Sequence, residues 1–223
     1  MPLSRHGGMG NALSFVRARV TTILTHPAVP LAIALGLGRE RISSRLLFAG
    51  VAASVIPDLD VLAFRIGIPY ASAFGHRGFS HSLLLALVVA VIGAALARYL
   101  SSTPKRAFWF MFAAVASHGI LDALTNGGLG VAFLWPFSSE RFFAPVQPIE
   151  VAPLRLSRLL SPRGLSVLRS EVLWVWFPLL AAALGAIATR RFRALTHHSS
   201  GPARKAAQAA QFKRVRRAWR VTS

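Results

Sequence analysis

Long apolar runs decide what this chain can fold into. Three carry few charged residues and a fourth is interrupted by two aspartates: Leu83–Leu100, Ala107–Leu124, Val172–Thr189 and Leu46–Phe64. Each run approaches the ~20 residues that a helix needs to cross a bilayer. The sequence therefore predicts an all-α fold, a polytopic membrane bundle of four transmembrane helices.

A fifth apolar segment, Ala28–Gly38, is too short to cross a bilayer alone. We expect a half-helix or an interfacial element there. Hydrophobic residues make up 54% of the chain and the mean hydropathy is +0.52, both above the range of a typical soluble domain. The alternative, an unusually apolar soluble helical protein, does not account for the spacing of the runs.

Composition divides the chain into three segments. Residues 1–25 form a basic N-terminal segment, residues 26–190 a membrane-embedded domain, and residues 191–223 a basic tail. Within the tail, Ala203–Arg220 mixes large apolar and basic side chains, which favours an amphipathic interfacial helix. Met1–His26 lacks the sustained apolar core of a cleavable signal peptide.

The net charge of +19 is unevenly distributed along the chain. Nineteen of the 26 Lys and Arg residues fall before the first predicted span, between the second and third, or after the fourth. With four spans these regions share one side of the membrane, and the positive-inside rule makes that side cytoplasmic. We therefore expect both termini in the cytoplasm and membrane lipids as partners of the basic tail. Nucleic-acid binding would be a secondary function.

Only seven residues are acidic, and three of them lie inside the apolar runs: Asp58, Asp60 and Asp122. Histidines accompany these carboxylates, namely His76, His81 and His118. An ionisable group in hydrocarbon is costly, so it persists only when paired, hydrated or bound to a metal. One such residue alone is more often a structural polar group or part of a proton path. In the four-span topology, however, all of them fall at one external depth, which makes a buried metal site the leading hypothesis.

Local spacing supports this hypothesis. His118 and Asp122 are four residues apart and share a helix face. Pro57 precedes the other two aspartates and is expected to disturb the helix there. Ser80 is a candidate N-cap for the next helix. The chain has no cysteine, and imidazole with carboxylate suits Zn²⁺, Mn²⁺ or Fe²⁺. The predicted cofactor is a divalent metal, with zinc or manganese favoured.

Several short motifs follow one another from His26 to Phe143: Thr25–His26, Ile56–Asp60, His76–Leu83, Ser117–Asp122 with Thr125, Gly130–Val131, Leu134–Phe137 and Arg141–Phe142. Together they resemble the YdjM-like family of bacterial inner-membrane metal-dependent hydrolases. The region after Val172 fits only as a generic membrane segment.

The resemblance implies a hydrolase of the bacterial inner membrane. The expected metal ligands are His26, Asp58, Asp60, His76, His81, His118 and Asp122. His26 enters this set through the resemblance and conflicts with the four-span topology, which places it on the cytoplasmic side. If His26 is a ligand, either Ala28–Gly38 is re-entrant or the topology is wrong.

The expected chemistry is attack of a metal-activated water on an ester or phosphoester, in a lipid or lipid-linked substrate. The residues expected to act in catalysis are Asp58, Asp60, Asp122 and Arg77. One aspartate that the metal does not fully engage is the general base, and Arg77 either binds an anionic substrate or is an interfacial charge. Two other classes remain: an ion or proton transporter or channel, and a non-catalytic scaffold with a structural metal.

Overall fold

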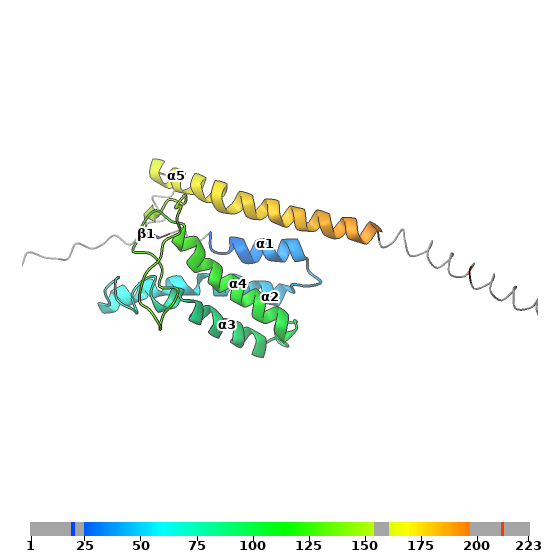
Figure 1. Ribbon diagram of the computed structural model, residues 1–223, viewed down its shortest axis with the longest axis horizontal. Coiled ribbons are helices and arrows are strands. Elements are labelled where there is room, and N and C mark those ends of the chain that lie inside the picture. The colour runs from blue at the N-terminus through cyan, green and yellow to red at the C-terminus, as the bar shows by residue number, and fades with distance from the viewer. Residues whose placement is uncertain (1–18, 21–24, 154–160, 197–210, 212–223) are drawn as a thin grey trace, which may run out of the picture.

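Five α-helices, two of them continued by 3₁₀ or π turns, form nearly all regular structure in the described residues (Figure 1). The computed structural model describes residues 19–20, 25–153, 161–196 and 211. In chain order the elements are β1 (Arg19–Val20), α1 (Ala28–Leu37), α2 (Ser44–Val55), η1 (Ile56–Ile66), η2 (Phe79–His81), α3 (Leu83–Ala95), α4 (Pro104–Ala123), β2 (Ala152–Pro153), α5 (Pro162–Glu171) and η4 (Val172–Trp176). The predicted all-α class is confirmed. The predicted interfacial helix in the tail lies outside the described residues, except for one position.

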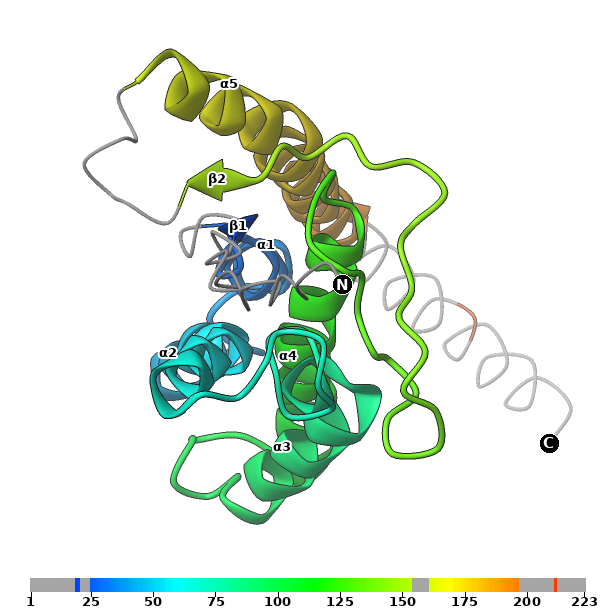
Figure 2. The same ribbon diagram turned by 90° about the vertical axis from the view of Figure 1, so that its left-hand side faces the viewer.

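α4 is the central helix of the bundle, packed against α1, α2 and α3 (Figure 2). The hydroxyl of Thr103 accepts a hydrogen bond from the backbone N–H of Arg106, and Pro104 occupies the first turn, so the helix begins with a standard cap. Large and small apolar side chains are buried along its whole length, among them Phe110 and Ala114. Burial on several faces fits a helix that is apolar nearly all round.

A stripe of small residues brings α3 close to α4. Ala86, Ala90 and Gly93 are all buried, and their spacing of four and three residues places them on one face of α3. A Cβ at Gly93 would lie 2.6 Å from Cγ of Met111. Small side chains of this kind let two helix backbones approach, which is a common basis of helix pairing in membranes.

The polar segments coincide with breaks in the helices. Pro57 falls where α2 gives way to the 3₁₀ turns of η1, which confirms the predicted disturbance. The predicted cap at Ser80 is wrong, because Ser80 lies inside the separate turn η2. Ser82 caps α3 instead, its hydroxyl accepting a hydrogen bond from the N–H of Leu85 at 3.2 Å.

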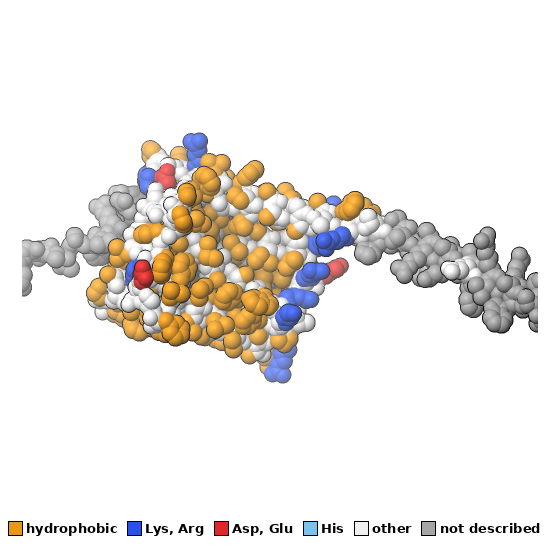
Figure 3. Space-filling model, viewed as in Figure 1, with side chains coloured by type: hydrophobic (Ala, Val, Ile, Leu, Met, Phe, Trp, Pro, Cys, Tyr) orange, Lys and Arg blue, Asp and Glu red, His pale blue; other side chains and the backbone are white. Residues whose placement is uncertain are grey.

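The helix that begins as α5 runs for 35 residues, Pro162–Thr196, and together with Ser44–Ala63 it is long and apolar enough to cross a membrane. Most of its apolar side chains are exposed, and apolar side chains cover the visible middle of the bundle (Figure 3). α1 and α3 are shorter apolar helices. The predicted count of four spans therefore stays a prediction.

α1 lies lengthwise in the bundle rather than along its surface. Ile33, Ala34 and Leu37 pack against the core formed by α2, α3 and α4, and a Cβ at Gly36 would lie 3.3 Å from Cβ of Ala186 in the long helix. Because α1 to α4 alternate in direction (Figure 1), residue 26 lies at the same end as η1, η2 and the last turn of α4. We call this the ligand end.

The opposite end, formed by residues 38–43, 96–103 and 190–196, we call the basic end. Arg190 lies there and donates a hydrogen bond to the carbonyl oxygen of Leu37 at 2.7 Å. Arg19 was expected on this side as well, but β1 pairs antiparallel with β2, opposite Pro153 near the start of α5. That expectation is wrong, because the ten-residue α1 carries the chain from one end to the other.

Replacing Gly50 with Leu is expected to destabilise the bundle, because a Cβ at Gly50 would lie 2.3 Å from Cε1 of the buried Phe110. We expect a loss of about 1–3 kcal/mol from overpacking, measured as a lower midpoint of thermal unfolding in detergent. Gly185→Leu is the matched control, since nothing lies within 4 Å of the corresponding Cβ. Equal losses in both variants would contradict this packing.

Candidate metal centre

Four segments of the chain deliver histidine and aspartate to the ligand end. His26 directly precedes α1, Asp58 and Asp60 lie in η1, and the η2 region supplies His76 and His81. α4 adds the remaining two, His118 and Asp122, from its last two turns. The sequence predicted this convergence for six of the residues, and the structure adds His26, which the four-span topology had placed at the other side.

The ligand atoms of Asp58, His81, His118 and Asp122 all lie within 4.8 Å of one another, and all four residues are buried. Nε2 of His81 is 3.0 Å from Nε2 of His118 and 3.1 Å from Oδ2 of Asp122. Oδ1 of Asp58 is 3.4 Å from Nε2 of His118. We call these four residues the central cluster.

Hydrogen bonds on the far side of the rings aim them at the cluster. Nδ1 of His118 lies 2.7 Å from the carbonyl oxygen of Ser54. A carbonyl oxygen only accepts, so Nδ1 carries the proton and Nε2 presents its lone pair to the cluster. Nδ1 of His81 faces Ser80 Oγ at 3.0 Å and Asp60 Oδ2 at 3.3 Å. Such outer partners set the orientation and basicity of metal-binding histidines.

Asp60 occupies a different position from the other two aspartates. Its Oδ1 lies 2.6 Å from Nδ1 of His76, and its Oδ2 accepts hydrogen bonds from Ser80 Oγ and from the backbone N–H of Arg77. Asp60, His76 and His81 form a second group able to hold a metal. His81 belongs to both groups, so the two candidate positions are adjacent.

His26 stacks on the ring of His118, with ring centroids 3.5 Å apart, and its Nε2 lies 3.5 Å from Oδ2 of Asp58. Neither ring nitrogen has a hydrogen-bond partner among the described residues. Burial, followed by the nearby His118, lowers the pKa of His26 to about 3, so the ring is neutral and able to bind a cation. α1 therefore begins at the ligand end, so His26 lies with the other six candidate ligands, and the side of the membrane stays a prediction.

His81 differs from His26 in its protonation. Burial lowers the pKa of His81, but hydrogen bonds and charge attraction from Asp122 and Asp60 outweigh that effect and raise the pKa to about 9. A metal-free cluster therefore holds a proton on His81. A divalent cation that binds there has to displace this proton, as is general for histidine ligands.

Arg77 is fully buried and lies behind Asp122. Its Nε is 3.1 Å from Oδ2 of Asp122, and its two terminal nitrogens donate to the carbonyl oxygen of Gly127 and to Oγ1 of Thr125. An exposed interfacial charge is excluded by this burial. These contacts support a role in holding Asp122 ionised and in place, while anion binding by Arg77 stays a prediction.

The glycine cluster after α4 allows the close approach of Arg77. A Cβ at Gly128, where φ is +88°, would lie 2.8 Å from NH1 of Arg77 and 2.7 Å from the Tyr70 hydroxyl. The segment around Gly128 is thus a turn that packs on the guanidinium of Arg77.

Sequence reasoning missed Arg141 as part of this region. Its guanidinium donates hydrogen bonds to the carbonyl oxygens of Tyr70, Ser72 and His76 at 2.9–3.2 Å, and so ties residues 70–76 to the later loop. The backbone of Phe142 pairs with that of Val131 beside it. The only signal in the sequence was the presence of Arg141–Phe142 among the family-like motifs.

The residues present fit a divalent metal. Two imidazole nitrogens and two carboxylate oxygens converge in a buried site, and Oδ1 of Asp58 has no hydrogen-bond partner in the described residues. Ligand atoms that repel one another or lack partners are costly to bury together, and a divalent cation between them would offset that cost. Imidazole and carboxylate are ligands of zinc, manganese and iron, so the donor set does not select one metal.

The fold and the cluster define a class: a helical membrane protein with a buried His/Asp centre at one end of its bundle. The profile of the YdjM inner membrane protein family matches residues 20–194, and the chain belongs to that family. It is 49% identical over 158 residues to inner membrane protein YbcI of Escherichia coli, covering 70% of this chain and 91% of that protein. No solved structure matches the chain. The predicted inner-membrane family is thereby confirmed.

The full-length protein purified in detergent is expected to bind Zn²⁺ or Mn²⁺, and His118→Ala is expected to lower the affinity by about 100-fold or more, since it removes a ligand and not only an outer partner. Metal content and affinity are measured by elemental analysis and titration calorimetry. Glu140→Gln changes an exposed acidic residue and is the control. A wild-type protein that takes up neither metal would contradict the site.

Proposed function

We propose that this protein is a metal-dependent hydrolase of the inner membrane that cleaves an ester or phosphoester. The observation that carries the proposal is the central cluster, in which one carboxylate oxygen of Asp58 lacks a hydrogen-bond partner among the described residues. Asp58 is also the member of this cluster with the greatest exposure, at 8%. A reacting water would therefore meet Asp58 first.

The three aspartates have different surroundings, which favours different roles. Asp122 is paired with Arg77, and Asp60 is engaged by His76, Ser80 and a backbone N–H. Asp58 is the best candidate for the general base, because its side chain is the most exposed of the three, at 9% against 4% for Asp60 and 2% for Asp122. Asp58, His81, His118 and Asp122 would hold a divalent ion, which would contribute Lewis acidity towards water and towards the scissile ester or phosphoester. Asp60 and Ser80 hold the histidines in position.

Exposed aromatic residues near the ligand end support a substrate that arrives from the bilayer. Phe137 is 93% exposed, and Phe74 and Phe143 are also exposed. Aromatic side chains at a membrane interface sit at the level of the lipid headgroups. A lipid or a lipid-linked ester would present its polar group at the same depth as the cluster.

A structural metal site is the second candidate, favoured by burial. His26, His76 and His118 have no exposed surface, and closed sites of this kind stabilise folds without catalysis. Transport has no comparable support in the described residues, although intramembrane His and Asp can relay ions.

An assay of hydrolysis distinguishes a catalytic metal site from a purely structural one. The metal-loaded protein is tested on phosphodiester and phospholipid substrates, with Asp58→Asn expected to lower the rate by about 100-fold or more while leaving the fold intact. Asp60→Asn keeps the shape of the side chain but weakens its hold on His76, so a loss of about 10–100-fold is expected. Glu140→Gln is the control. Metal bound tightly by a protein inactive on every substrate would favour the structural role.

The basic end is the cytoplasmic end, which makes the ligand end external. Arg39, Arg41, Arg98 and Lys105 all lie in its loops or first turns, which is the bias that the positive-inside rule describes. A reporter that functions only in the cytoplasm is expected to be active when it is fused to the carboxyl terminus, and a reporter that functions only outside the cytoplasm is expected to be inactive there. An active external reporter would reverse the assignment. Since α1 begins at the ligand end, the same fusion at the amino terminus tests whether that terminus is cytoplasmic.

A further inference from the structure

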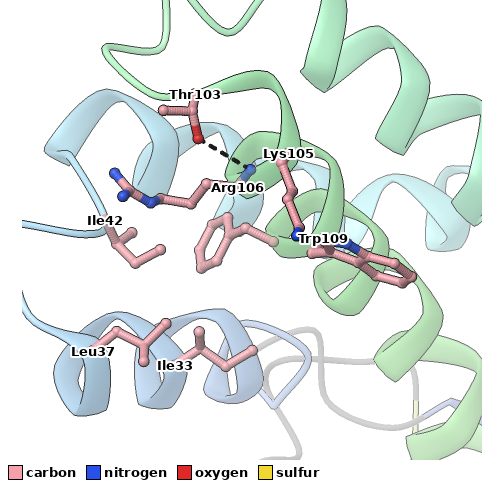
Figure 4. A pocket seen from close by; sticks show the side chains of 8 residues that line it. Ile33, Leu37, Ile42, Thr103, Lys105, Arg106 and Trp109 are labelled. Carbon is pink, nitrogen blue, oxygen red and sulfur yellow. Dashed lines mark hydrogen bonds between the residues drawn. The ribbon is translucent and has the colours of Figure 1, made fainter.

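A groove at the basic end lies between α1 and the start of α4, far along the bundle from the metal cluster. It has a volume of about 400 Å³ and is lined by Ile33, Leu37, Ile42, Thr103, Lys105, Arg106, Trp109 and Phe110. That volume is in the range of small-molecule sites. Figure 4 shows Ile33 and Leu37 on one wall, and Lys105 and Arg106 arriving from the opposite helix.

The groove combines an apolar floor with a cationic mouth. Phe110 and Ile42 are buried, whereas Lys105 and Trp109 are exposed, and Trp109 is 59% exposed. No ion pair joins Lys105 or Arg106 to an acidic side chain in the described part of the chain, and no acidic residue lines the groove. The two charges are therefore available to an anion.

Further basic residues lie in the loops around this groove. Arg39, Arg41, Arg45 and Arg98 occupy the neighbouring loops, with Glu40 as the single acidic residue in residues 38–45 and 96–106. Figure 3 shows basic side chains gathered at this end of the molecule, next to the apolar middle. A ligand with one negative group and an apolar chain would match both halves of the surface.

We propose that this groove binds one anionic phospholipid, with its phosphate at Lys105 and Arg106 and an acyl chain along Ile33, Leu37 and Trp109. Charge complementarity selects an anionic ligand, since basic pockets between membrane helices recognise lipid headgroups. The apolar wall selects a lipid over a free phosphate, which would leave that wall unused. Lipid in the leaflet at the basic end reaches the groove laterally.

The test uses the delipidated full-length protein and phosphatidylglycerol, with bound lipid counted by native mass spectrometry. The double variant Lys105→Gln/Arg106→Gln is expected to lower the affinity by about tenfold or more. Arg191→Gln/Arg193→Gln removes the same charge from exposed positions of the long helix that do not line the groove, and it is the matched control. It is expected to change the affinity less than twofold.

Leu37→Trp supplies an independent test, because it fills the apolar wall and leaves every charge in place. Loss of lipid in this variant, with unchanged helical content, supports the groove. Equal losses in the two double variants would mean diffuse attraction to the basic end and would overturn the proposal. Displacement of the lipid by inorganic phosphate would also overturn it, since the site would then recognise the anion alone. Phosphatidylcholine is expected to bind measurably more weakly, and equal binding would contradict the role of charge.

Discussion

The cost of burying carboxylates in an apolar bundle is the constraint on which this structure depends. Asp58, Asp60 and Asp122 could not each be compensated separately in hydrocarbon, because an ionised group there needs a partner of opposite charge or a metal. The bundle meets this need by bringing all three to one end, where Arg77 and the histidines surround them. The helix directions, the 3₁₀ break after α2 and the turns around η2 all follow as ways of placing those groups together.

The short helix α1 brings His26 to the end of the bundle where the buried carboxylates lie. A chain that entered the bundle at the other end would leave this histidine far from Asp58, and the stacked contact with His118 could not form. Ten helical residues span only about 15 Å, yet that is enough to pass from the ligand end to Gly38, where Arg190 closes the carboxyl end of the helix. Length alone is therefore a poor guide to whether a helix belongs inside a membrane bundle.

Polar residues in apolar runs were sufficient to predict six of the seven candidate ligands, because the energetic penalty is visible without any coordinates. The roles within the set were not predictable. Asp60 pairs with His76, and Arg77 pairs with Asp122, because of loops whose course depends on contacts distant in sequence. Arg141 shows the same limit, since its three carbonyl acceptors lie about 70 residues earlier in the chain. The placement of Ser82 rather than Ser80 at the cap depended on a turn of three residues.

The two ends of the bundle differ in how their charges are compensated, and the orientation proposed for the molecule rests on this difference. At the ligand end, charges are buried and compensate one another, so their effect is local and weakly screened. At the basic end they are exposed and, apart from Glu40, positive, so they act on the membrane surface within about one Debye length. The groove connects this exposed charge to the apolar core, so a lipid bound there would contact the basic side chains and the bundle at once. α4 runs from that groove to His118 and Asp122, so one helix is shared by both ends.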